Sequence, residues 1–135
     1  QLRDAGAEYG AKTGRPRRVG PIDLVATRYG CRIQGATEVA LTKLDVLSYM
    51  KEIPVCTQYE VNGEKTDDFP FTAVIDEAKP VLTTVPGWGC DISGVRKYED
   101  LPQAARDYVE YVEQAIGVHI SYVSVGAGRD EIIYR

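Results

Sequence analysis

Residues 10–20 constrain the fold most, because they exclude regular secondary structure over a long stretch. The segment holds three glycines, a proline, a threonine and four cationic side chains. Glycine loses much conformational entropy in a helix or strand, and proline lacks the backbone donor that either structure needs. We therefore expect a loop whose backbone N–H groups and guanidinium groups bind carboxylates or phosphates. A surface turn in which arginines only increase solubility is the alternative interpretation.

Charge is distributed unevenly along the chain. Residues 1–32 carry seven Lys/Arg and three Asp/Glu, a net +4, whereas residues 33–135 carry nine and seventeen, a net −8. The sum is the net charge of −4 for the whole chain. A basic segment on an acidic body favours a local anion site and argues against a surface that binds nucleic acid.

Composition bounds the class of protein. With 135 residues, 44% of them hydrophobic, the chain fits one globular domain, residues 1–135, without an internal boundary. No apolar run approaches the ~20 residues of a membrane span, and no signal peptide is visible. Cys31, Cys56 and Cys90 are odd in number and form no C-x-x-C pattern. A reduced, cytoplasmic protein is the simplest interpretation.

Hydrophobic periodicity and turn signals predict a mixed α/β fold, with a mixed sheet, flanking helices and a β-hairpin. We expect helices over 23–33, 46–51 and 101–116, a helical turn within 72–78, and strands over 37–42, 53–61, 65–71, 80–85, 118–125 and 131–134. Asn62-Gly63 predicts a two-residue hairpin turn. Pro54 and Pro70 are expected to keep their strands short or at a sheet edge.

Two helices have defined starts and buried faces in the sequence. Asp23 is expected to cap the first helix, and Asp100 the last, with Gln103 at the capping-box position and Gly117 as the stop. The expected buried faces are Ile22, Val25/Ala26, Tyr29 and Ile33 for the first helix, and Leu101, Ala105, Tyr108, Val112 and Ala115/Ile116 for the last. Trp88 and the single histidine, His119, are expected to be structural.

Lys43-Leu44-Asp45 follows a predicted strand, which is where α/β folds bind ligands. A carboxylate at Asp45 can accept both the N1–H and the 2-amino hydrogens of guanine, while the stem of Lys43 lies along the base. Adenine would leave that carboxylate unpaired, which is costly when it is buried. The alternative is that Asp45 caps the next helix and Lys43 is solvated.

Ser124-Val125-Gly126 ends another predicted strand with small residues. Its backbone N–H groups can contact a flat base, although the small residues and glycine that ordinarily mark the change from a strand to a turn explain this sequence equally well. There is no G-x-x-x-x-G-K-[ST], H-E-x-x-H or G-x-S-x-G pattern. The chain shows candidate binding residues but no complete catalytic constellation, and its single histidine and scattered cysteines form no zinc-binding set.

Several segments, in order, closely resemble the C-terminal part of the adenylosuccinate synthetase family: residues 6–18, 40–47, 85–88, 92–96, 99–102 and 123–126. The resemblance covers essentially the whole chain. Family polypeptides are much longer and the first residue here is Gln1, so we expect a piece corresponding to about the last third of such a protein. The resemblance implies a larger α/β fold similar to that of P-loop NTPases.

The family reaction joins IMP and L-aspartate with GTP and Mg²⁺, giving adenylosuccinate, GDP and phosphate. The resemblance implies that one loop closes over aspartate and IMP: Ala11, Lys12, Thr13, Gly14, Arg15, Pro16 and Arg17. Arg15 would also reach the IMP ribose. The implied GTP contacts are Arg17, Lys43, Leu44, Asp45, Ser124, Val125 and Gly126.

The family's phosphate-binding loop, catalytic residues and most Mg²⁺ contacts lie in its N-terminal part. The isolated chain is therefore expected to be inactive, and the complete protein to be a cytoplasmic homodimer. A stand-alone, non-catalytic nucleotide- or anion-binding module is the alternative. The family usually has threonine at Lys12, tryptophan at Pro21 and Gly-Pro-Asp-Arg at residues 126–129, so the roles around these positions are open.

Overall fold

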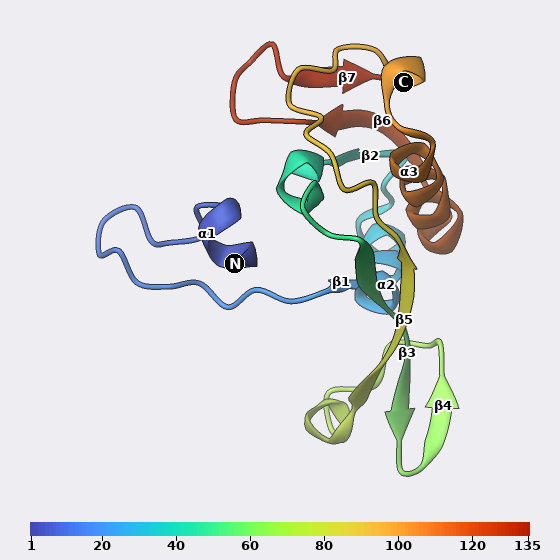
Figure 1. The fold of residues 1–135 in the computed structure, drawn as a ribbon. Helices are drawn as coiled ribbons and strands as arrows, with labels where there is room; N and C mark the ends of the chain where they lie inside the picture. The colour runs from blue at the N-terminus through green and yellow to red at the C-terminus, as the bar shows by residue number, and fades with distance from the viewer.

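A computed structural model describes all of residues 1–135 and confirms the mixed α/β class. Two helices, α2 (Leu24–Gln34) and α3 (Gln103–Ile116), pack together beside the strands (Figure 1). A single turn of helix, α1 (Leu2–Ala5), contacts the turn at residues 44–47, and the glycine-rich loop after α1 projects away from the rest of the fold (Figure 1).

The strands divide between two mixed sheets. In the first, β3 (Glu52–Val61) pairs in parallel with β1 (Ile22–Asp23) and antiparallel with β4 (Glu64–Thr66) and β5 (Lys79–Pro86). In the second, β6 (His119–Ser124) lies between β2 (Glu38–Leu41), which is parallel to it, and β7 (Ile132–Tyr134), which is antiparallel. Because β2 and β6 are parallel, their C-terminal ends lie side by side.

Local turn chemistry set the hairpin as expected. Asn62 (φ 53°) and Gly63 (φ 83°) both have positive φ, which a two-residue turn between β3 and β4 requires. β4 is shorter than predicted, so Pro70 lies outside any strand. The expectation for Pro54 was wrong, since β3 is long and internal. The parallel pairing with β1 begins only at Val55, so Pro54 has no partner there.

Helix α2 begins as predicted but buries a different face. The Asp23 side chain accepts a hydrogen bond from the backbone N–H of Ala26 at 2.9 Å, so the cap is confirmed. The predicted burial of Tyr29 and Ile33 was wrong, since they are 44% and 70% exposed. Tyr29 instead stacks on Phe69 with the ring centroids 4.6 Å apart, outside the main core.

Helix α3 has the predicted buried stripe and the predicted stop, with Gly117 at φ 70°. Its predicted cap was wrong. Pro102 occupies the cap position, and Asp100 lies in a preceding 3₁₀ turn, η3 (Tyr98–Asp100). Gln103 makes no capping box because its side chain bonds to Asp107 and Arg106 instead.

The main core lies between α3 and the two sheets. Its fully buried side chains include Val55 of β3, Val109 of α3, and Ile120 and Val123 of β6. Two further 3₁₀ turns are η1 (Leu44–Leu47) and η2 (Ile75–Glu77). The helical turn expected within 72–78 is thus confirmed, whereas the helix expected over 46–51 was wrong: a 3₁₀ turn at Leu44–Leu47 stands there instead.

The remaining strand predictions are confirmed in β2, β5, β6 and β7. None of the helices is both long enough and apolar enough to cross a membrane. Trp88 is half-buried against Tyr108 in an edge-to-face contact, with ring centroids 5.9 Å apart, as a structural residue should be.

Candidate functional site

The glycine-rich loop after α1 is a short closed turn. Tyr9 and Pro16 form an antiparallel bridge, and the Gly10 N–H donates to the Arg15 carbonyl oxygen at 2.8 Å. The Gly14 N–H donates to the Gly10 carbonyl oxygen at 2.8 Å, and Gly14 adopts φ 65°. The predicted loop is therefore confirmed, and its backbone is fixed by its own hydrogen bonds.

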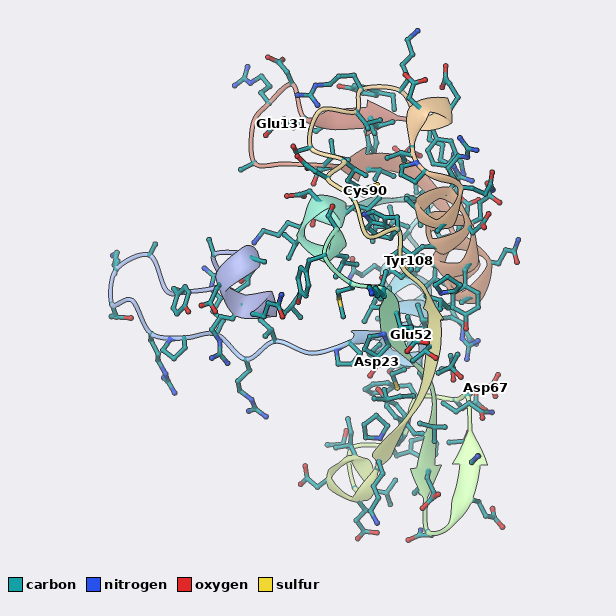
Figure 2. The ribbon with its side chains drawn as sticks, in the orientation of Figure 1. Asp23, Glu52, Asp67, Cys90, Tyr108 and Glu131 are labelled. Carbon is teal, nitrogen blue, oxygen red and sulfur yellow. The ribbon has the colours of Figure 1, made fainter.

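Most cationic side chains of this loop are free. Those of Lys12, Arg15 and Arg18 are exposed and form no hydrogen bond or ion pair within the chain. Figure 2 shows nitrogen-tipped side chains pointing outward from this part of the ribbon. The Thr13 hydroxyl accepts only a long bond, 3.4 Å, from the Arg15 N–H. The loop thus presents several unpaired donors to an anionic ligand.

Glu8 connects this loop to the turn after β2. Its Oε2 accepts from Arg17 Nη1 at 3.0 Å, and its Oε1 accepts from Lys43 Nζ. The hydrogen bonds from Lys43 and then Arg17 hold the pKa of Glu8 below its usual value. Sequence reasoning missed Glu8; the only signal was a lone carboxylate beside a basic segment.

The turn at residues 43–45 is held against the end of β6. Lys43 adopts a left-handed conformation (φ 61°), and its backbone N–H donates to Ser124 Oγ at 2.7 Å. Lys43 Nζ donates to the Gly6 carbonyl oxygen at 2.7 Å as well as to Glu8. Two of the predicted site segments, separated by 81 positions, are therefore adjacent in space. The idea that Lys43 is simply solvated is wrong.

Asp45 occupies an unusual position within η1. Its side chain does not cap the turn, since Lys43 occupies the cap position and no side-chain capping bond forms. Its Oδ1 is buried and is the one buried side-chain oxygen or nitrogen in residues 1–135 without a hydrogen-bond partner. Leaving a buried acceptor unpaired costs free energy. A ligand donor would remove that cost only if the groups covering Oδ1 moved aside, because the atom has essentially no exposed surface.

The loop after β6 is organised by Glu131. The Val125 N–H donates to the Glu131 carbonyl oxygen at 2.9 Å, and the Gly128 N–H donates to its Oε2 at 2.5 Å. A Cβ placed on Gly126 would lie 2.3 Å from the same Oε2, so glycine is required there unless Glu131 moves. Figure 2 places Glu131 in the loop between β6 and β7. The Val125 N–H is therefore already used, whereas the Gly126 N–H has no hydrogen-bond partner in the chain.

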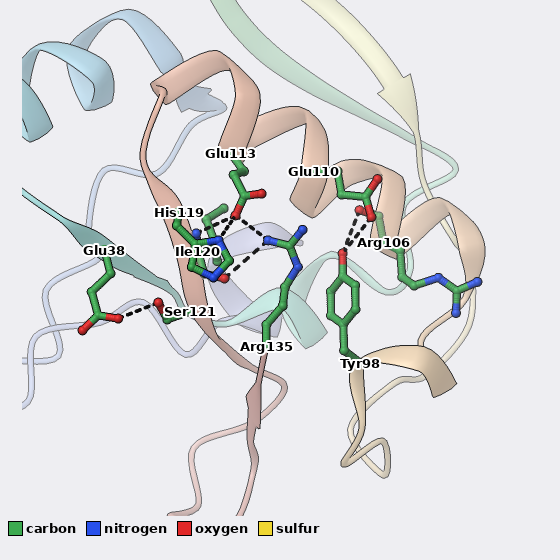
Figure 3. Close-up of polar contacts among 9 residues, drawn as sticks. All are labelled: Glu38, Tyr98, Arg106, Glu110, Glu113, His119, Ile120, Ser121 and Arg135. Atoms are coloured by element: carbon green, nitrogen blue, oxygen red, sulfur yellow. Dashed lines mark hydrogen bonds and ion pairs between the residues drawn. The ribbon is translucent and has the colours of Figure 1, made fainter.

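His119 belongs to a structural cluster away from these turns. Its Nδ1 lies 2.8 Å from Glu113 Oε2, which also accepts from the Ile120 N–H at 2.7 Å and from Arg135 Nη1 (Figure 3). Burial opposes ionisation of Glu113, but the bonds from Arg135 and Ile120 outweigh it and hold its pKa low. The cluster ties α3 to β6 and β7.

A cleft of about 420 Å³ lies between the loop after α1 and the turn at 43–47. Glu8, Arg18 and Lys43 line its polar side, and Leu41 and Leu47 contribute to its apolar side. Asp45 and Ser124 lie outside it. The three cysteines are free, and no trio of His, Cys, Asp or Glu side chains is placed to hold a metal.

Comparison with known proteins adds what this geometry alone does not give. The family model of adenylosuccinate synthetase matches residues 1–133. The chain belongs to the adenylosuccinate synthetase family. A curated adenylosuccinate synthetase from Bifidobacterium adolescentis is 49% identical over 133 residues, which cover 98% of this chain and 31% of that protein. The protein of the same name from Frankia alni is 46% identical over 134 residues, again with 98% and 31% coverage.

A solved structure of fully ligated adenylosuccinate synthetase from Plasmodium falciparum matches with a TM-score of 0.92 and 34% identity. The match covers 99% of this chain and 33% of that one. The chain therefore spans about a third of the length of the adenylosuccinate synthetases that it matches. The fold of this third is the family's own.

Proposed function

We propose that this chain supplies the substrate loop and the guanine-recognition turn of a GTP-dependent ligase of AMP synthesis. The complete enzyme joins IMP and L-aspartate and forms adenylosuccinate, GDP and phosphate. Family membership supports the reaction class. One observation on this chain carries the assignment of the nucleotide, namely the buried, unpartnered Oδ1 of Asp45 beside the end of β6.

Guanine matches Asp45 because its N1–H and its 2-amino group are both donors. A carboxylate can accept both, and Oδ1 has no competing donor within the chain. Adenine has an acceptor at N1 and no 2-amino group, so it would leave the carboxylate unpaired. The ammonium of Lys43 is held by Glu8 and Gly6, which leaves its methylene stem as a surface along which the base lies. Ser124, Val125 and Gly126 bound the base on the other side.

The loop from Ala11 to Arg17 is the proposed aspartate and IMP contact. The unpaired guanidinium of Arg15 and the hydroxyl of Thr13 meet the carboxylates of aspartate, and Arg15 reaches the IMP ribose. Arg17 is the proposed GTP contact, and Glu8 already orients its guanidinium. Lys12 adds a cation to this loop, which favours an anionic substrate. Such a site contributes by positioning substrates and stabilising charge.

Magnesium is part of the proposed reaction, and we propose that it is held mainly outside residues 1–135. No three metal-ligating side chains converge. On the basis of family membership, the metal, the phosphate-binding loop and the acid–base residues are assigned to the rest of the enzyme. It follows that the 135 residues alone form no adenylosuccinate. A cytoplasmic homodimer is the proposed state of the complete protein.

Calorimetric titration of the complete polypeptide that contains residues 1–135 tests the proposal. GDP should bind with clear preference over ADP, and equal affinities would overturn the assignment of Asp45. Adenylosuccinate formation by the isolated chain would refute the division of labour proposed here. A native protein of 14.9 kDa, the mass of these 135 residues alone, would favour the stand-alone binding module instead.

A further inference from the structure

Glu8 forms ion pairs with both halves of the candidate site. Its two carboxylate oxygens have different partners: Oε1 accepts from Lys43 Nζ, and Oε2 accepts from Arg17 Nη1 at 3.0 Å. The Glu8 side chain is 22% exposed, compared with 47% for Lys43 and 57% for Arg17. The carboxylate therefore lies beneath the two cations and between them.

The contact of Glu8 with the loop is reinforced by the backbone. The Arg17 N–H donates to the Glu8 carbonyl oxygen at 3.0 Å, and Arg3 Nε donates to the Arg17 carbonyl oxygen at 2.8 Å. The guanidinium of Arg17 has no other partner in the chain. A movement of residues 10–17 on closing over a ligand is therefore transmitted to Glu8 through two separate bonds to Arg17.

The contact of Glu8 with the guanine side runs through Lys43 alone. Lys43 Nζ donates to Glu8 and to the Gly6 carbonyl oxygen, and the Lys43 N–H donates to Ser124 Oγ at 2.7 Å. Lys43 thus belongs at once to the network of the loop and to the turn that carries Asp45. Without Glu8, the loop and the turn would share no ion pair.

We propose that Glu8 is a positioning residue that couples aspartate binding at the loop to guanine-nucleotide binding at the turn. This inference rests on the proposed function and adds an energetic link between its two subsites. The bound nucleotide fixes Lys43, Lys43 fixes the Glu8 carboxylate, and Glu8 holds Arg17 and the loop in the conformation that accepts aspartate. Thermodynamic linkage requires the effect to be reciprocal, so aspartate must tighten nucleotide binding by the same factor.

The test measures that factor in the complete polypeptide that contains these residues. The Kd of GDP is determined by calorimetry with and without saturating L-aspartate, and the ratio is the coupling factor. We expect a ratio of about fivefold or more, the lower end of ordinary allosteric coupling. In Glu8→Gln, which removes the charge but keeps the shape, the ratio should fall below about twofold, which is less than ordinary allosteric coupling. A ratio unchanged in Glu8→Gln would overturn the inference.

Two further variants separate coupling from a loss of structure. Glu64→Gln changes an exposed carboxylate on β4 that has no ion pair, and its ratio should equal that of the unmodified protein. Glu8→Asp keeps the carboxylate on a shorter stem, and its ratio should lie between those of the unmodified protein and Glu8→Gln. A Glu8→Asp ratio no higher than that of Glu8→Gln would contradict a role for the carboxylate.

The same titrations distinguish failure of this inference from failure of the proposed function. If GDP binds in preference to ADP but aspartate does not change its Kd, only the coupling is wrong. If GDP shows no preference over ADP, the assignment of the nucleotide itself is wrong. Coupling is a ratio within one variant, so a general loss of affinity or stability does not mimic its loss.

Discussion

Replacing Asp45 by asparagine is the sharpest single change that the structure offers. The substitution preserves shape but removes one of the two carboxylate acceptors that guanine would use. A hydrogen bond to a charged group contributes about 1.5–3 kcal/mol. The Asp45→Asn protein should therefore bind GDP about 10- to 150-fold more weakly, since 1.4 kcal/mol corresponds to a factor of ten.

The same substitution also gives a prediction about thermal stability. Oδ1 of Asp45 is buried without a partner in the free protein, so it contributes no hydrogen bond that the substitution could remove. The midpoint of thermal unfolding should therefore not fall in Asp45→Asn, even though nucleotide affinity does. If Asp45 had only a structural role, the unfolding midpoint would fall and nucleotide affinity would not.

The assay is calorimetric titration with GDP and ADP, together with a thermal unfolding scan. Asp76→Asn is the matched control, because Asp76 is an exposed carboxylate in the 3₁₀ turn η2 with no side-chain partner. It should leave both GDP affinity and unfolding unchanged. Unchanged GDP preference in Asp45→Asn, or equal losses in Asp76→Asn, would refute the reasoning.

Three further changes test the loop, the packing and the structural cluster. Arg15→Ala should raise the KM for aspartate by the equivalent of about 1.5–3 kcal/mol. The unfolding midpoint should not fall, because the Arg15 guanidinium has no partner in the chain. Steady-state kinetics measure the KM, and an unchanged KM would remove the loop from the aspartate site. Gly87→Ala should destabilise the protein by about 1–3 kcal/mol, since its Cβ would lie 2.1 Å from the Met50 carbonyl oxygen. Gly94→Ala is the control, because its Cβ would meet nothing within 4 Å. Equal urea midpoints for the two variants would contradict a close approach of Gly87 to Met50. Glu113→Gln should reduce the free energy of unfolding at neutral pH but not in acid. The folded-state pKa of Glu113 lies below its ordinary value of 4.5, so the charge stabilises the fold above that pH, and this stabilisation disappears as pH falls through the lower folded-state pKa. Urea unfolding measures the loss, and a loss of equal size at neutral and acid pH would show that the charge plays no part.

Features that depend on neighbouring residues were predictable from the sequence. The Asn62-Gly63 turn, the Asp23 cap and the Gly117 stop each depend on the conformational preferences of one or two residues, and all three are confirmed. The exposure of Tyr29 was not predictable in this way. Periodicity identifies a helix, but contacts with distant residues such as Phe69 decide which face is covered.

The candidate site shows the same limit. The loop and both turns were identifiable as segments, whereas Glu8 escaped notice because its partner Lys43 lies 35 positions away. Glu131 was missed because its role depends on how closely Gly126 approaches it. The burial of Asp45 Oδ1 is likewise a property of the folded chain, not of the Lys-Leu-Asp sequence.

The most direct test of the central claim is the reaction itself. The complete polypeptide that contains residues 1–135 is incubated with IMP, L-aspartate and magnesium, with either GTP or ATP, and adenylosuccinate is followed by its absorbance. We predict product with GTP and little or none with ATP, and loss of the GTP-dependent rate in Asp45→Asn. Absence of product with GTP, or equal rates with GTP and ATP, would contradict the account.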